Sequence, residues 1–100
     1  MDKTFEKVWI ELQTCLQERR FIRNWTVNRG FFGKDFFAQS QREGIYCDPP
    51  GTLVNKDAFH QIWEVWDKYL AQQISRRELC DLPNYYTKYV ISIFHQCLEK

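Results

Sequence analysis

The sequence predicts an α+β fold with an N-terminal helix, a three-stranded antiparallel meander, and then three helices packed on the sheet. Near both ends of the chain, and after residue 55, apolar residues recur every three or four positions, which is the helical period. Between residues 21 and 54 they alternate, and Gly and Pro punctuate the segment as in a hairpin sheet. Because no linker rich in Gly, Ser or Pro divides the 100 residues, we expect a single domain over residues 1–100.

The first helix is expected over residues 4–18, with Thr4 as its N-cap. Its apolar residues share one face: Phe5, Val8, Trp9, Leu12, Cys15 and Leu16.

The meander is expected in three segments, FIRNWTV at 21–27, DFFAQSQ at 35–41 and GIYCD at 44–48. Arg42, Glu43 and Gly44 would close the second hairpin. Gly30 and Gly33 would allow positive φ angles in the link between the first two strands. A short extension at 52–54 would precede the next helix.

Asn55 is the expected N-cap of a helix whose apolar stripe runs unbroken from Phe59 to Leu70. A capping box, S-x-x-E at 75–78, predicts a short helix that ends near Asp81.

The last helix is expected to begin at Asn84 or Thr87, after Pro83. It is apolar on nearly all sides, which is typical of a core helix, and Thr87, Lys88 and Ser92 are placed on its outer side. Three helices in series resemble a helix-turn-helix only superficially, because few residues that read bases stand near the start of the last one.

Charge limits the possible partners. The chain has 14 basic and 13 acidic residues, a net charge of +1, which disfavours a histone-like DNA binder.

The start, MDKTFEKVW, has no apolar signal-peptide core, and no stretch approaches the roughly 18 apolar residues of a membrane span. We therefore expect a cytoplasmic protein that does not bind a membrane.

The four cysteines, at positions 15, 47, 80 and 97, form no C-x-x-C pair, and His60 and His95 stand alone. We expect reduced and mostly buried thiols, no metal site and no cofactor.

Catalytic motifs are also missing from the sequence. It contains no nucleophile elbow, and the GFFGK segment has neither phosphate-loop nor dinucleotide spacing. Pairs of carboxylates such as Glu64 and Asp67 lack a supporting Lys or His pattern. We therefore predict that the protein is not an enzyme and has no catalytic residues.

The segment from Arg19 to Lys34 departs furthest from an ordinary domain, because it holds five cations, no acid and four aromatic rings. Cations neutralise phosphates and rings stack on bases, so this pattern suits nucleic acid. It equally suits a half-buried sheet with a charged rim. Strand alternation would place Phe21, Arg23 and Trp25 on one side. The candidate binding residues are Arg20, Phe21, Arg23, Trp25, Arg29, Phe32, Lys34, Arg76 and Arg77.

The chain resembles a small bacterial domain that reads G-Y-x-G-x-x-F, then D-F-x-x-V-x-x-x-W-x-x-Y, then N-T-x-Y-I-x-S-I-L. Such sequences are mostly uncharacterised, and some are carried by mobile integron gene cassettes. The resemblance implies one domain and does not indicate any particular activity. It departs where two tyrosines separate Asn84 from Thr87, and where Gln73 replaces a usual glycine. The matching positions are Trp25, Gly30, Gly33, Phe36, Phe59, Trp66, Tyr69, Arg76, Asn84, Thr87, Tyr89, Ile91 and Ile93.

Aromatic residues make up 17% of the chain, which favours some exposed rings and therefore a partner. The leading hypothesis is a non-enzymatic interaction module that binds another protein or forms a homodimer through exposed aromatic and Arg residues. The alternative is a nucleic-acid-binding module that uses residues 19–34. An aromatic small-molecule pocket and an enzyme rank below both.

Overall fold

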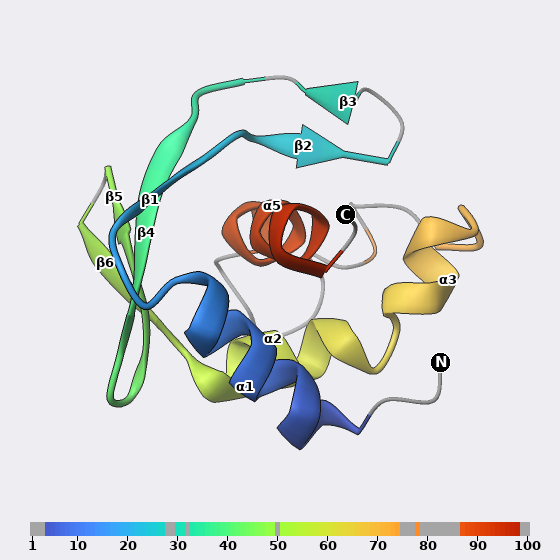
Figure 1. The fold of residues 1–100 in the computed structure, drawn as a ribbon. Helices are drawn as coiled ribbons and strands as arrows, with labels where there is room; N and C mark the ends of the chain where they lie inside the picture. The colour runs from blue at the N-terminus through green and yellow to red at the C-terminus, as the bar shows by residue number, and fades with distance from the viewer. Residues whose placement is uncertain are drawn as a thin grey trace.

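The computed structural model describes residues 4–27, 30–31, 33–49, 51–74, 78 and 87–98, and it confirms a mixed α+β fold (Figure 1). The described elements, in chain order, are α1 (Phe5–Cys15), β1 (Arg20–Ile22), β2 (Trp25–Thr26), β3 (Gly30–Phe31), β4 (Phe36–Gln41), β5 (Gly44–Asp48), β6 (Thr52–Asn55), α2 (Lys56–Trp63), α3 (Trp66–Leu70) and α5 (Thr87–Leu98).

The main sheet has four antiparallel strands in the order β1-β4-β5-β6, one more than the predicted meander. The predicted extension after Gly51 is a full strand, β6, which pairs with β5. The predicted hairpin turn at Arg42 and Glu43 is confirmed between β4 and β5. Figure 1 shows α1, α2 and α5 all on one side of this sheet, so these helices cover one of its faces and leave the other uncovered.

Strand alternation divides the sheet residues between those two faces. The inner face contributes Ile22, Phe36, Ala38, Ile45, Cys47 and Val54 to the core, each at most 2% exposed. The neighbours of these residues in sequence point to the opposite side, where Phe21, Phe37 and Leu53 are exposed.

The predicted first strand, 21–27, is wrong as a single strand. It ends at Ile22, and after Arg23 and Asn24 the chain re-enters as β2, which pairs with β3 in a separate sheet over α5 (Figure 1). The backbone amide of Asn24 donates to Asp35 Oδ1 at 2.9 Å, and its side chain donates to the Lys34 carbonyl at 3.1 Å. These bonds to a side chain and a loop carbonyl replace the sheet ladder at the point where the strand is interrupted.

Two glycines make the link between β2 and β4 possible. Gly30 has a φ of +66° and Gly33 a φ of +91°, the left-handed region that other residues rarely adopt. The predicted role of both glycines is confirmed.

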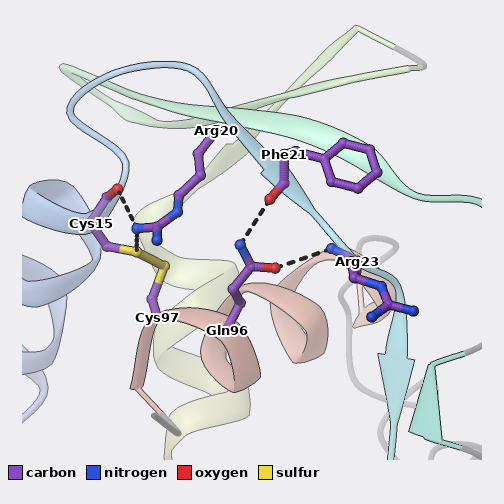
Figure 2. Close-up of a disulfide and its surroundings, with 6 residues drawn as sticks. All are labelled: Cys15, Arg20, Phe21, Arg23, Gln96 and Cys97. Carbon is purple, nitrogen blue, oxygen red and sulfur yellow. Dashed lines mark hydrogen bonds between the residues drawn. A yellow bond between two sulfur atoms is a disulfide. The ribbon is translucent and has the colours of Figure 1, made fainter.

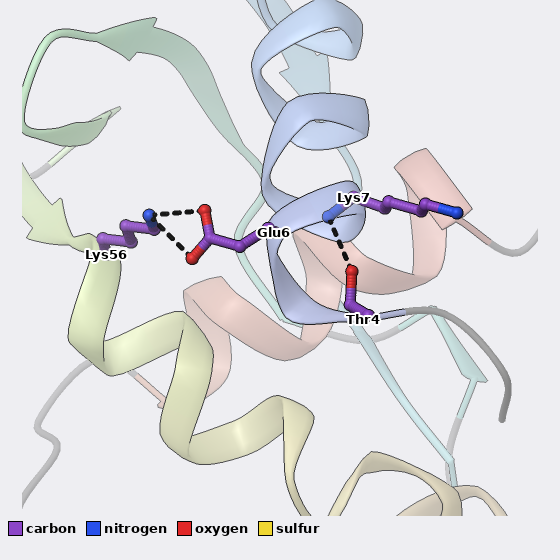
Figure 3. Close-up of polar contacts among 4 residues, drawn as sticks. All are labelled: Thr4, Glu6, Lys7 and Lys56. Atoms are coloured by element: carbon purple, nitrogen blue, oxygen red, sulfur yellow. Dashed lines mark hydrogen bonds and ion pairs between the residues drawn. The ribbon is translucent and has the colours of Figure 1, made fainter.

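The predicted N-caps Thr4 and Asn55 are confirmed, whereas the predicted caps at Ser75 and Asn84 lie outside the described residues. Thr4 Oγ1 accepts from the amide of Lys7 (Figure 3), and Asn55 Oδ1 accepts from the amide of Ala58 at 3.0 Å. Lys56 Nζ lies 3.1 Å from a carboxylate oxygen of Glu6, so the starts of α1 and α2 are also joined by an ion pair (Figure 3). Helix α1 ends at Cys15, three residues earlier than expected.

The helix predicted from Asn55 to Leu70 is divided in two. Glu64 and Val65 form a turn between α2 and α3. The turn allows Trp63 and Trp66, one on each helix, to meet the ring of Phe94 edge-on at centroid distances of 5.8 and 5.1 Å. Apart from Glu78, the short helix predicted from Ser75 to about Asp81 lies outside the described residues.

Helix α5 forms the centre of the core. It contacts α1, α2, β1 and β2, and its residues from Tyr89 to Phe94 are all buried. Thr87 and Ser92 are buried at 3% and 0%, so their predicted outer placement is wrong, because neighbours surround this helix on several sides. None of the described helices has the length and apolar character needed to cross a membrane.

Candidate interaction surface

The structure separates the residues that the sequence grouped as one binding surface. Arg20, Phe21, Arg23, Trp25 and Lys34 lie in different surroundings. The other four candidates, Arg29, Phe32, Arg76 and Arg77, lie outside the described residues.

Trp25 faces α5 and is half-buried. Its ring stacks on His95 with centroids 3.9 Å apart and planes within 8° of parallel, and its backbone amide donates to Ser92 Oγ at 3.0 Å. The predicted arrangement with Phe21, Arg23 and Trp25 on one side of one strand is therefore wrong. The interruption at Asn24 turns Trp25 toward the helix instead.

Arg23 lies between β1 and β2. Its guanidinium carbon is 4.0 Å from the ring centroid of Phe31, a cation–π contact, and Phe31 in turn meets His95 edge-on at 5.7 Å. Its backbone amide donates to Gln96 Oε1 at 3.1 Å. Arg23 is exposed but already has an aromatic partner within the chain.

Arg20 reaches from β1 to the end of α1. Nη1 donates to the carbonyl of Cys15 at 3.4 Å and lies 3.2 Å from its sulfur (Figure 2).

Cys15 is bonded to Cys97 in a disulfide, so the prediction of reduced thiols is wrong for this pair. The fold places the end of α1 beside the end of α5, and the two Cα atoms are 5.9 Å apart despite a sequence separation of 82 residues. Cys47 is a buried free thiol, as predicted, and burial raises its pKa from 9.0 to about 12. Cys80 lies outside the described residues.

The exposed side of the four-stranded sheet carries an aromatic pair, of which sequence reasoning had singled out only Phe21. Phe21 on β1 lies opposite Phe37 on β4, and the rings meet edge-on at 5.4 Å. Phe21 is 48% exposed and Phe37 38%. Together with Tyr46, Leu53 and two charged residues they form what we call the outer sheet face: Arg19, Phe21, Phe37, Tyr46, Asp48 and Leu53.

The two charged residues of the outer sheet face flank the rings. The guanidinium carbon of Arg19 is 4.4 Å from the centroid of Phe37, and its Nη2 is 3.2 Å from Asp48 Oδ2. A signal for this face was present in the sequence, since adjacent residues of a strand point to opposite faces and Phe36-Phe37 must place one ring on each.

Intramolecular contacts occupy the basic residues on β1 and beside it. Arg19 pairs with Asp48, Arg20 with the Cys15 carbonyl, and Arg23 with Phe31. Lys34 lies apart from them, in a small hollow with Asp35 and Lys88. The described part of the basic run therefore does not form one continuous cationic patch.

Among the described residues no group of three or more His, Cys, Asp or Glu side chains is placed to hold a metal ion.

Comparison with protein-family models, with curated proteins and with solved structures gave no match. The resemblance to integron cassette domains stays a prediction.

Proposed function

We propose that this protein is a non-enzymatic interaction module that binds protein through the outer sheet face. The observation that carries the proposal is the exposed Phe21–Phe37 pair on a sheet whose other side is covered by helices. Aromatic and Arg side chains are enriched at the centres of protein interfaces. Phe21 and Phe37 would supply the apolar centre, and Arg19 and Asp48 the polar rim.

A second copy of the chain is the partner that fits this face best. Arg19 and Asp48 carry opposite charges beside the same ring, Phe37. In a two-fold dimer the same patch meets itself, so Arg19 of each copy can face Asp48 of the other while the rings meet near the axis. Both charges are exposed, and therefore they would set the orientation of the dimer more than its affinity.

Nucleic acid is the second candidate. Some RNA-binding domains also present rings from a four-stranded sheet to bases. However, the outer sheet face includes the carboxylate of Asp48, which repels phosphate and balances the charge of Arg19, so this pair carries no net positive charge. These contacts favour a protein partner.

The cytoplasm stays our proposed location. In that compartment disulfides are uncommon and are usually transient.

Sedimentation equilibrium of the wild type and of Phe37→Thr tests the proposal. Threonine suits a strand but removes the exposed ring, so we expect a wild-type dimer and a monomeric variant. Ile10→Thr is the matched control, because Ile10 is an exposed apolar residue on α1, 61% exposed and outside the outer sheet face. The control should dimerise as the wild type does.

Tryptophan fluorescence with added oligonucleotide, at low and high salt, separates the two candidates. Binding that weakens steeply with salt and is lost in Phe37→Thr would assign the face to nucleic acid. A wild type that stays monomeric at all concentrations would contradict the dimer.

A further inference from the structure

We propose that Cys15 and Cys97 form a reversible redox site, in which Cys15 exchanges with small thiols and disulfides that carry carboxylates, of the glutathione type. This proposal does not depend on the proposed function, because the site lies at the junction of α1, β1 and α5 (Figure 2).

The two cysteines of the disulfide differ in exposure. Cys15 is half-buried at the last residue of α1, whereas Cys97 is only 4% exposed within α5. Thiol–disulfide exchange requires a thiolate to reach the sulfur that it attacks. An external thiol can therefore reach Cys15 more easily than Cys97, so any mixed disulfide should form on Cys15.

Arg20 places a positive charge beside the accessible sulfur. Its Nη1 lies 3.2 Å from Cys15 Sγ and is held there by a second hydrogen bond to the Cys15 carbonyl (Figure 2). When the disulfide opens, this guanidinium favours the thiolate, which is the form that reacts.

A hollow of about 460 Å³ is lined by both cysteines and by Arg20. Its volume falls in the range of small-molecule sites. Ile10 and Leu98 contribute apolar walls, while Arg20 and Glu11 contribute one charge of each sign. A guanidinium binds carboxylates well, so a small thiol that carries a carboxylate matches Arg20 in this lining.

The exchange proceeds in two balanced steps. In the reduced protein the Cys15 thiolate attacks one sulfur of a small disulfide, forms a mixed disulfide and releases the first small thiolate. Cys97 then loses its proton to solvent and attacks the sulfur of Cys15. The Cys15–Cys97 bond forms and the second small thiolate leaves. Together the two cysteines lose two electrons and two protons. The small disulfide takes up these electrons and protons and becomes two thiols.

Intact-mass spectrometry of the reduced protein after addition of oxidised glutathione tests the order of events. We expect one glutathionyl adduct on Cys15 that disappears as the internal disulfide forms. In Cys97→Ser the adduct should persist, and in Cys15→Ser Cys97 should stay unmodified. Peptide mapping assigns each adduct to its cysteine, Cys80 included, and the buried Cys47 is an internal control.

The role of Arg20 is tested by alkylation of the reduced Cys97→Ser protein with iodoacetamide at pH 7. Arg20→Gln should slow the reaction of Cys15 roughly threefold, because the thiolate fraction falls more than its intrinsic reactivity rises. Arg19→Gln is the matched control, since Arg19 faces Asp48 and Phe37 instead of the disulfide. Arg20→Lys should recover part of the rate.

Two results would overturn the proposal. The first is a wild-type time course in which Cys97 carries the first adduct or in which no adduct forms on Cys15. This course needs no substitution, so a variant that fails to fold does not affect it. The second is an equal alkylation rate for the Arg20 and Arg19 variants.

Discussion

The side-chain amide of Gln96 is hydrogen-bonded to the backbone of Phe21, with Nε2 donating to the carbonyl oxygen at 2.8 Å (Figure 2). Its Oε1 accepts from the amide of Arg23 at 3.1 Å. In a strand, the carbonyl of one residue and the amide two residues later face the same side. One glutamine on α5 therefore binds the Phe21 carbonyl of β1 and the Arg23 amide just beyond its end, on the side that faces away from β4. A strand that paired with this edge of β1 would have to displace the Gln96 side chain.

Gln96→Met keeps the length of the side chain and removes both hydrogen bonds. We expect the free energy of unfolding to fall by about 1 kcal/mol, because water replaces the lost partners only in part. The amide hydrogen of Arg23 should also exchange faster. Urea unfolding and hydrogen exchange measure the two effects. Gln41→Met, at the exposed end of β4, is the control, and equal protection of Arg23 in both variants would contradict the role of Gln96.

Ser92 holds β2 to the core helix. Its hydroxyl accepts from the amide of Trp25 at 3.0 Å and donates to the carbonyl of Lys88 at 2.9 Å, and the side chain is fully buried. Ser92→Ala leaves the amide of Trp25 without this acceptor, so we expect a loss of about 1–3 kcal/mol in unfolding free energy. Thermal or urea unfolding measures it. Ser40→Ala, on the half-buried part of β4, should change stability less, and a similar loss at both sites would argue against this account.

Cys47 should make stability fall at high pH. Burial raises its pKa from 9.0 to about 12, so between these values the folded protein keeps a proton that the unfolded chain has lost. The stabilising contribution is complete below pH 9 and is lost as pH rises toward 12, by at most about 1.4 kcal/mol per pH unit. Urea unfolding at pH 8 and pH 10 measures the slope. In Cys47→Ala the decline should be shallower, and parallel profiles would exclude the thiol as its cause.

Gln72 lies just after the C-cap of α3, in a conformation that glycine would adopt more easily. Its φ is +60°, and the amides of Gln72 and Gln73 donate to the carbonyls of Tyr69 and Lys68, the paired bonds of a Schellman motif. Gln72→Gly should therefore raise the unfolding free energy by about 1 kcal/mol, since a non-glycine residue is strained there. Gln73→Gly should not stabilise. Calorimetry of both variants compares them, and an equal effect would show that the φ angle is not the cause.

The features that sequence reasoning predicted correctly depend on residues close together in the chain. The N-caps Thr4 and Asn55 bind amides three residues ahead, and the glycines near residue 30 act through their own φ angles. Sequence reasoning missed the break after Ile22. The hydrogen bond that accompanies the break joins Asn24 to Asp35, which is eleven positions away, and no local pattern reports that contact. The disulfide was missed for the same reason over a much longer separation.

The structure corrects the predicted binding surface more than it corrects the predicted fold. Alternation correctly separates Phe36 from Phe37 and requires one ring on each face of the sheet. It does not say which face the helices cover, because that depends on how α1, α2 and α5 pack together. The sequence also located the cations, but not their partners within the chain.

Sequence patterns alone are enough to predict the α+β class, the two confirmed helix starts, the hairpin at Arg42 and the conformation of the linking glycines. These follow from local backbone preferences and hydrogen bonds between near neighbours. Three other contacts become visible only in the folded chain: Trp25 packs on His95, Phe21 meets Phe37 on the exposed face, and Cys15 is bonded to Cys97. Each of these contacts joins residues distant in sequence, and it forms because α5 packs at the centre of the core and the other elements are arranged around it.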